Sequence, residues 1–152
     1  QSTENLGMGY DYAPGTFVNL RNVMAERGWI YVTINDYEWD GLRTELVERY
    51  GERAVYLAGV SAGGSAILQE AVAHPERYAG LLVLCPALPR LEGAKRLTMP
   101  MVVSVGAEDV LIAAFCRTLA RDVARVNKRL VYVEIPGGGH SAPLTRADWA
   151  KQ

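Results

Sequence analysis

Apolar runs alternate with amphipathic segments along this chain. Short runs rich in β-branched and aromatic residues predict strands at residues 29–34, 54–58, 81–85, 101–105 and 130–135. Between the strands, apolar residues recur at helical spacing and predict four helices. The positions that mark these helices are Phe17, Leu20 and Met24 with Gly28 as C-cap; Leu42, Leu46 and Tyr50; Ile67, Leu68, Ala71 and Val72; and Leu111, Phe115, Leu119 and Val123.

Strands that alternate with helices place the chain in the α/β class. The pattern predicts a mainly parallel sheet of about five strands with helices on both faces. We find no repeat and no linker, so residues 1–152 are expected to form a single domain. The longest stretch without periodicity is residues 87–98, which is too short for a lid domain.

Composition narrows the class of protein. With 49% hydrophobic residues, the 152-residue chain has enough apolar material for a core. The net charge is −1 and there is no Lys/Arg block, which argues against nucleic acid as a partner. No apolar run approaches the roughly 18–20 residues of a membrane span. Cys85 and Cys116 lack C-x-x-C spacing, so we expect two buried free thiols rather than a disulfide or a metal site.

Three side chains capable of catalysis fall at the carboxyl ends of predicted strands. Ser61 follows the second strand, Asp109 the fourth and His140 the fifth. Ligands of open parallel sheets bind at the carboxyl ends of the strands. The three residues are therefore candidates for one catalytic site.

Ser61 stands in the pattern G-x-S-x-G at residues 59–63, between an apolar strand and an amphipathic helix. A nucleophilic serine needs a sharp, strained turn that lifts its oxygen above the sheet, and flanking glycines remove side chains that would clash there. The helix that follows directs its N-terminal dipole and the Ala62 N–H toward the developing oxyanion. We therefore predict Ser61 as nucleophile and Ala62 as an oxyanion donor.

His140 and Asp109 fill the remaining roles of a triad. His140 lies on a glycine-rich loop and would accept the Ser61 proton, while Asp109 would orient the imidazole. Glu108 is the rival for Asp109 because it is adjacent and equally acidic. His74 ends the helix after Ser61, away from the active edge, and Glu134 lies within a strand; both are poorer candidates.

The order Ser61, Asp109, His140 resembles that of α/β-hydrolases. The phrases at residues 59–64, 74–80, 106–109 and 138–140 also look like this family. The S-A-G-G form resembles the esterase branch that includes polyhydroxybutyrate-depolymerase-like and feruloyl-esterase-like enzymes. The resemblance implies an ester substrate, an acyl-serine intermediate, and neither a metal nor an organic cofactor.

The N-terminal segment departs from the family pattern. The family places a buried strand, followed by a loop with the second oxyanion N–H, before the nucleophile. Residues 1–10 do not look like such a strand, and Tyr10, at the end of residues 7–10, is the best candidate for the second donor. Two interpretations stay open: the strand belongs to an absent N-terminal piece, or the sheet closes without it. Because Gln1 is not Met, processing or truncation is open, as is the compartment, cytoplasmic or secreted.

The leading hypothesis is a serine hydrolase that cleaves carboxylic esters of small or medium acyl groups. A peptidase or acyltransferase on the same triad is one alternative. A non-catalytic binding domain, or a subunit that needs a missing N-terminal piece, is another. The expected partner is a small-molecule ester, and an uncovered sheet edge would allow oligomers to form.

Overall fold

A computed structural model describes residues 26–32, 38–88 and 90–145 of the chain. The chain divides into two compact units, residues 1–53 and 54–152. In the first, helix α2 covers Trp39–Tyr50 and ends at Gly51, whose N–H donates to the Val47 carbonyl at 2.8 Å. The expected helix around Leu42 and Leu46 is present, although none of its residues is buried.

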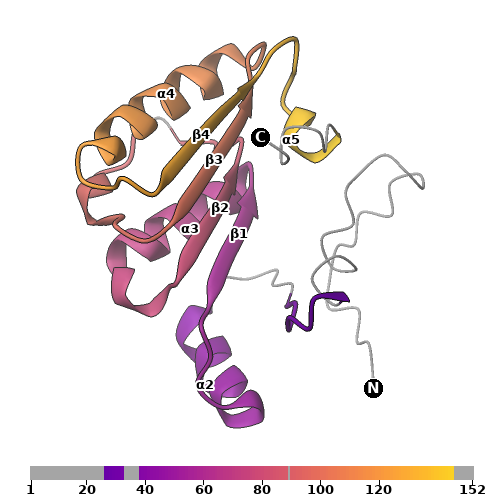
Figure 1. The fold of residues 1–152 in the computed structure, drawn as a ribbon, viewed down its shortest axis with the longest axis vertical. Helices are drawn as coiled ribbons and strands as arrows, with labels where there is room; N and C mark the ends of the chain where they lie inside the picture. The colour runs from indigo at the N-terminus through magenta and orange to yellow at the C-terminus, as the bar shows by residue number, and fades with distance from the viewer. Residues whose placement is uncertain (1–25, 33–37, 89, 146–152) are drawn as a thin grey trace. The chain divides into compact units, whose positions relative to one another are not determined.

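The second unit is built on a parallel sheet of four strands in the order β1-β2-β3-β4 (Figure 1). The strands are β1 Tyr56–Val60, β2 Gly80–Leu84, β3 Met101–Gly106 and β4 Leu130–Ile135. They correspond to the last four strands that the sequence predicts. The second predicted strand is displaced by two residues, because β1 continues to Val60 and leaves Ser61 alone as the turn.

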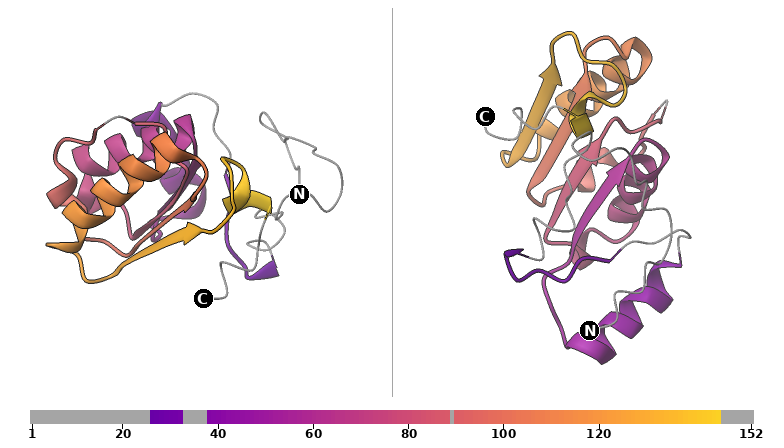
Figure 2. Two further views of the ribbon diagram at one scale, coloured as in Figure 1. Left: turned by 90° about the horizontal axis from the view of Figure 1, so that it is seen from above. Right: turned by 90° about the vertical axis from the view of Figure 1, so that its right-hand side faces the viewer.

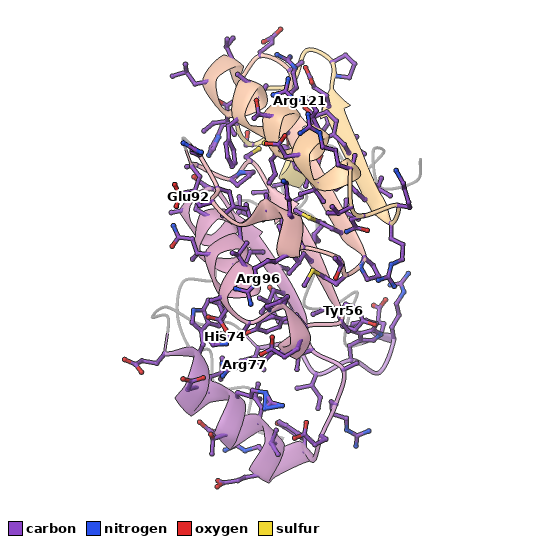
Figure 3. All side chains as sticks on the ribbon, turned by 90° about the vertical axis from the view of Figure 1, so that its left-hand side faces the viewer. Tyr56, His74, Arg77, Glu92, Arg96 and Arg121 are labelled. Atoms are coloured by element: carbon purple, nitrogen blue, oxygen red, sulfur yellow. The ribbon has the colours of Figure 1, made fainter. Side chains whose placement is uncertain are left out.

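Two long helices cover one face of this sheet, in front of the strands in Figure 3. Helix α3 spans Ala62–Ala73 and packs on β1 and β2, while α4 spans Val110–Ala124 and packs on β3 and β4. Since the strand order advances in one direction, right-handed crossovers bring both helices to the same side. In the described part of this unit, the remaining helical elements are short: η1 Pro75–Arg77, η2 Ala94–Arg96 and α5 Ala142–Thr145, which is yellow in Figure 2.

The core lies between the sheet and these helices. Strands β2 and β3 are the most enclosed, with four of five residues buried in β2 and five of six in β3. The continuous apolar runs of β2 and β3 therefore correspond to buried strands, as predicted. Among the described residues, no helix combines the length and the apolar character needed to cross a membrane.

The structure describes residues 29–32 of the strand predicted at residues 29–34, and these residues do not form a strand. Residues 29–32 belong to no helix or strand, and their side chains are 42–50% exposed. Strand propensity reflects packing against neighbouring strands, so an unpaired run gains little from it. Residues 33 and 34, and the predicted helix at Phe17–Met24, lie outside the described residues. Gly28 has the left-handed φ of 74° that a C-cap glycine adopts.

Leu111 was expected on the buried face of α4 and is 84% exposed instead. The buried side of the helix carries Ala113, Cys116 and Leu119, among others. Positions four apart drift by about 40° in a helix of 3.6 residues per turn. Over the three steps from Leu111 to Val123 the drift is about 120°, which removes Leu111 from the face that Val123 occupies.

Candidate active site

The carboxyl ends of the four strands form one edge of the sheet, and the candidate site is built there. Strand pairing aligns Val60 with Leu84, and Gly106 with Ile135. The residues that follow these strand ends are Ser61 after β1, Cys85 after β2, Asp109 after β3 and His140 after β4. The three predicted site residues therefore follow β1, β3 and β4 of one parallel sheet, with Cys85 after the strand between the first two.

Ser61 forms the whole connection between β1 and α3. Its backbone has φ 53° and ψ −120°, an unfavourable conformation that costs a non-glycine residue about 1–3 kcal/mol. Its N–H donates to the Leu84 carbonyl at 2.9 Å, and its carbonyl accepts from the Ala87 and Ser65 N–H groups at 3.2 and 3.0 Å. Neighbouring backbone thus holds the strained turn in place. The Ser61 side chain does not cap α3, so its hydroxyl is not engaged at the helix N-terminus.

Close backbone packing explains two of the glycines around Ser61. A Cβ on Gly59 would lie 2.4 Å from the Gly63 carbonyl oxygen, so no side chain fits there. A Cβ on Gly64 would lie 3.2 Å from the Gly59 oxygen and 3.3 Å from the Leu84 oxygen. At Gly63 a Cβ would meet nothing within 4 Å. The expected steric role of Gly63 is therefore wrong: its backbone fills the space beside Gly59, and Gly64 makes the second close approach.

The Asp109 carboxylate and the His140 imidazole are directly hydrogen bonded. The Nδ1–H of His140 donates to Oδ2 of Asp109 at 2.5 Å. Asp109 is also the N-cap residue of α4, yet its side chain makes no capping bond. Its carboxylate is directed to the imidazole instead. This contact fixes the tautomer that leaves Nε2 of His140 able to accept a proton.

The loop that carries His140 rests on the end of β3. The Glu108 N–H donates to the Gly138 carbonyl at 2.8 Å, and the Ala107 N–H donates to the Ile135 carbonyl at 3.0 Å. A Cβ on Gly106 would lie 2.2 Å from the Gly138 oxygen. The absence of a side chain at Gly106 therefore lets the loop lie against β3 and brings His140 to Asp109.

The rival acids and the second histidine are engaged elsewhere or exposed. The Glu108 side chain is exposed, and Asp109 makes the contact with His140. Glu134 binds Arg117 on α4, with Nε donating to Oε2 at 2.9 Å, and this ion pair lowers the pKa of the Glu134 carboxyl. His74 is the C-cap residue of α3, at the end of that helix opposite Ser61, and lies near Arg77 and far from α4 in Figure 3.

Cys85 is a residue of this site that the sequence did not indicate. Its thiol is buried, and Sγ donates to the main-chain carbonyl of His140 at 2.9 Å. Burial raises the pKa of the Cys85 thiol from 9.0 to about 11. The group is therefore a protonated donor at neutral pH. Its position directly after a strand end, like that of Ser61, was the available signal. Both cysteines are free and buried, as predicted.

Cys85, Asp109 and His140 also form a group of possible metal ligands, with ligand atoms within 4.8 Å of one another. Their hydrogen bonds account for this proximity without a metal, since the Cys85 thiol binds the His140 carbonyl and the Asp109 carboxylate binds the imidazole. A metal would have to displace both contacts and deprotonate a thiol whose pKa burial has raised to about 11.

Of the two predicted oxyanion donors, Ala62 is among the residues that the structure describes. Ala62 is the first residue of α3, where backbone N–H groups have no partner within the helix. Its N–H is adjacent to the strained Ser61, as the sequence predicts for a donor. Tyr10 lies outside the described residues.

Comparison with solved structures identifies the fold. A thermostable esterase shares 21% identity and a TM-score of 0.59, over 65% of this chain and 27% of that one. A carboxylesterase from Mesorhizobium loti shares 21% identity and a TM-score of 0.57, over 67% of this chain and 50% of that one. A monoacylglycerol lipase from Paleococcus ferrophilus shares 15% identity and a TM-score of 0.55, over 66% and 65% respectively.

These likenesses show that the chain has the fold of α/β-hydrolases. The matches span between 27% and 65% of the lengths of the three structures. No protein-family model matches the sequence, and no protein with a curated description matches it.

Proposed function

We propose that this protein is a serine hydrolase that cleaves carboxylic esters of small or medium acyl groups. The observation that carries the proposal is the Asp109–His140 hydrogen bond of 2.5 Å, made at the sheet edge where the strained Ser61 ends β1. Ser61 is the nucleophile, His140 the general base and Asp109 the acid that orients His140. These three residues are far apart in the sequence and follow three different strands of the sheet.

The reaction proceeds in two halves. In the first, the Ser61 hydroxyl attacks the ester carbonyl carbon while Nε2 of His140 accepts the hydroxyl proton. The tetrahedral intermediate then collapses, the alcohol leaves with the proton from His140, and an acyl-serine remains. In the second half, water attacks the acyl carbon while His140 accepts a proton from the water. This second tetrahedral intermediate then collapses, the bond between the acyl carbon and the Ser61 oxygen breaks, the carboxylic acid leaves, and the proton from His140 returns to the Ser61 oxygen.

The oxyanion formed in each half requires hydrogen-bond donors. The Ala62 N–H at the N-terminus of α3 is the first donor, supported there by the helix dipole. Tyr10 is proposed as the second donor. The loss of one donor costs about 2.7–4 kcal/mol in the activation barrier, so a chain with Ala62 alone would still hydrolyse esters, slowly.

The likeness to the solved structures supports an ester as the substrate. Proteins described as an esterase, a carboxylesterase and a monoacylglycerol lipase share this fold. Ester hydrolysis is the chemistry common to those descriptions. We propose that residues 1–152 belong to one catalytic domain of this kind, which needs no metal or organic cofactor.

Labelling with a fluorophosphonate probe, together with turnover of short p-nitrophenyl esters, tests the proposal. Wild type should be labelled and should release p-nitrophenol, whereas Ser61→Ala should do neither. Thr118→Ala is a matched control, because it also removes a hydroxyl, and the Thr118 hydroxyl is exposed and donates to the Ala114 carbonyl within α4 rather than to a residue of the proposed site.

Two outcomes would contradict the proposal in different ways. If folded wild-type protein is neither labelled nor active on any of the esters, the enzyme hypothesis fails and a binding domain is the better explanation. If labelling persists in Ser61→Ala, the hydrolase hypothesis stands but the nucleophile is another residue.

A further inference from the structure

Cys85 contacts the backbone of the proposed general base, and the mechanism above does not use its thiol. The residue follows β2 directly and is fully buried. Its Sγ donates a hydrogen bond to the main-chain carbonyl of His140 at 2.9 Å. The contact joins positions 55 residues apart and restrains the loop at the residue whose imidazole must meet Ser61.

Cys85 also shares an unusual backbone conformation with Ser61. Among the described residues, these are the two non-glycine positions with positive φ, at 45° and 53°. They are neighbours across the sheet, because Val60 pairs with Leu84 at the ends of β1 and β2. Strained non-glycine residues persist where surrounding structure holds them, and they cluster at functional sites.

The segment around Cys85 holds Ser61 as well as His140. The Ser61 N–H donates to the Leu84 carbonyl at 2.9 Å, and the Ala87 N–H donates to the Ser61 carbonyl at 3.2 Å. Cys85 lies between these two contacts in the chain, and its own N–H donates to the Ser104 carbonyl of β3 at 2.9 Å. Residues 84–87 thus connect the backbones of the nucleophile and the general base.

We propose that Cys85 is a positioning residue, whose protonated thiol holds the His140 carbonyl and so fixes the imidazole relative to Ser61. The inference rests on the proposed function of Ser61 and His140. It does not make Cys85 a nucleophile, because a buried thiol that donates to a carbonyl must keep its proton.

Substitutions at Cys85 test the proposal, with Cys116→Ala as the control for the loss of another buried thiol. Cys85→Ala removes the donor, and Cys85→Ser keeps a shorter one. Cys85→Gly removes the donor while making the positive φ easy to adopt, so it tests the contact even if Cys85→Ala does not fold.

The first readout does not depend on hydrolysis. The chain has two histidines, so ¹⁵N-histidine labelling gives one ring for His140 and one for His74, an internal control. In wild type, the hydrogen-bonded Nδ1–H of His140 should give a protected downfield resonance. Cys85→Ala and Cys85→Gly should broaden or shift this resonance and leave His74 unchanged, whereas Cys116→Ala should preserve both.

The second readout separates positioning from probe binding. The maximal rate of fluorophosphonate labelling should fall roughly fivefold to tenfold in Cys85→Ala, in line with the loss of one hydrogen bond. The probe concentration at half-maximal rate should change little. Cys85→Ser should recover most of the lost rate, and Cys116→Ala should stay within about twofold of wild type.

Two results would overturn the inference. One is an unchanged His140 resonance and labelling rate in Cys85→Ala or Cys85→Gly. The other is an equal loss in Cys116→Ala, which would make the effect one of core packing. If wild type is not labelled at all, the proposed hydrolase function fails, and the His140 resonance alone then decides whether Cys85 positions that residue.

Discussion

The Asp109 carboxylate accepts a 2.5 Å hydrogen bond from Nδ1 of His140, while the side chain of its neighbour Glu108 is exposed. Of these two adjacent acids, Asp109 is therefore the one whose side chain contacts the imidazole. Glu108 instead contributes its backbone N–H, which binds the Gly138 carbonyl in the histidine loop.

This difference predicts unequal effects of two amide substitutions. Asp109→Asn should lower the rates of ester turnover and probe labelling by roughly 10³- to 10⁴-fold, because an amide no longer stabilises the correct tautomer and the imidazolium. Glu108→Gln should stay within about twofold, since its side chain is exposed. Parallel rate measurements check both. Equal losses in the two variants would contradict the assignment of Asp109.

The three proposed site residues could be predicted from the sequence because their signals are local. In each case an apolar run ends beside one or more glycines, and a polar side chain follows the strand within five residues. Parallel strands then place such ends along one edge without further information. Ser61, Asp109 and His140 all have this signature.

Features that depend on contacts between distant segments could not be found in this way. Cys85 looked like an ordinary buried thiol because its partner, the His140 carbonyl, is 55 residues away. The steric need for Gly64 rather than Gly63 depends on how the start of α3 packs against the end of β2. The apolar run at residues 29–32 has strand propensity, but propensity does not supply a pairing partner.

Gly106 offers a test of the packing that positions the histidine loop. In Gly106→Ala the new Cβ would lie 2.2 Å from the Gly138 oxygen, so the loop must move away from β3. We expect a loss of about 1–3 kcal/mol in the free energy of unfolding. A displacement of His140 by about 1 Å would also lower labelling of Ser61 by about 10²-fold.

Gly139→Ala is the matched control for Gly106→Ala, because a Cβ there meets nothing within 4 Å. Urea denaturation and labelling kinetics on both variants separate the two effects. A Gly106→Ala protein with wild-type labelling would show that the close approach of this loop does not matter for the site.

Gly59 and Gly63, on either side of Ser61, lead to two stability predictions of opposite sign. Gly59→Ala should destabilise the fold by about 1–3 kcal/mol, because its Cβ would lie 2.4 Å from the rigid Gly63 carbonyl. Gly63→Ala should stabilise it by about 0.5–1 kcal/mol, since the position is helical and open. Urea midpoints measure both. An unchanged urea midpoint in Gly59→Ala would mean that β1 and α3 can move apart beside Ser61.

Two leucines of α4 test the burial of that helix. Leu119 is 2% exposed, so Leu119→Ala should cost about 2–5 kcal/mol in the free energy of unfolding. Leu111 is 84% exposed, so Leu111→Ala should change stability by about 0.5 kcal/mol or less. Denaturant unfolding of the two variants distinguishes them. A large loss in Leu111→Ala would mean that another part of the protein covers this side chain.

The buried thiols predict a fall in stability at high pH. Burial raises the pKa of Cys85 from 9.0 to about 11 and that of Cys116 to about 12. Between pH 9 and these values the unfolded chain loses protons that the folded chain keeps. The stabilising contribution is therefore complete below pH 9 and is lost as pH rises toward 11 and 12. Urea unfolding at pH 8, 9.5 and 11 should show a steeper decline for wild type than for the double variant Cys85→Ala/Cys116→Ala, in which tyrosine and lysine titration is retained. Parallel declines in the two proteins would show that the thiols ionise equally in both states.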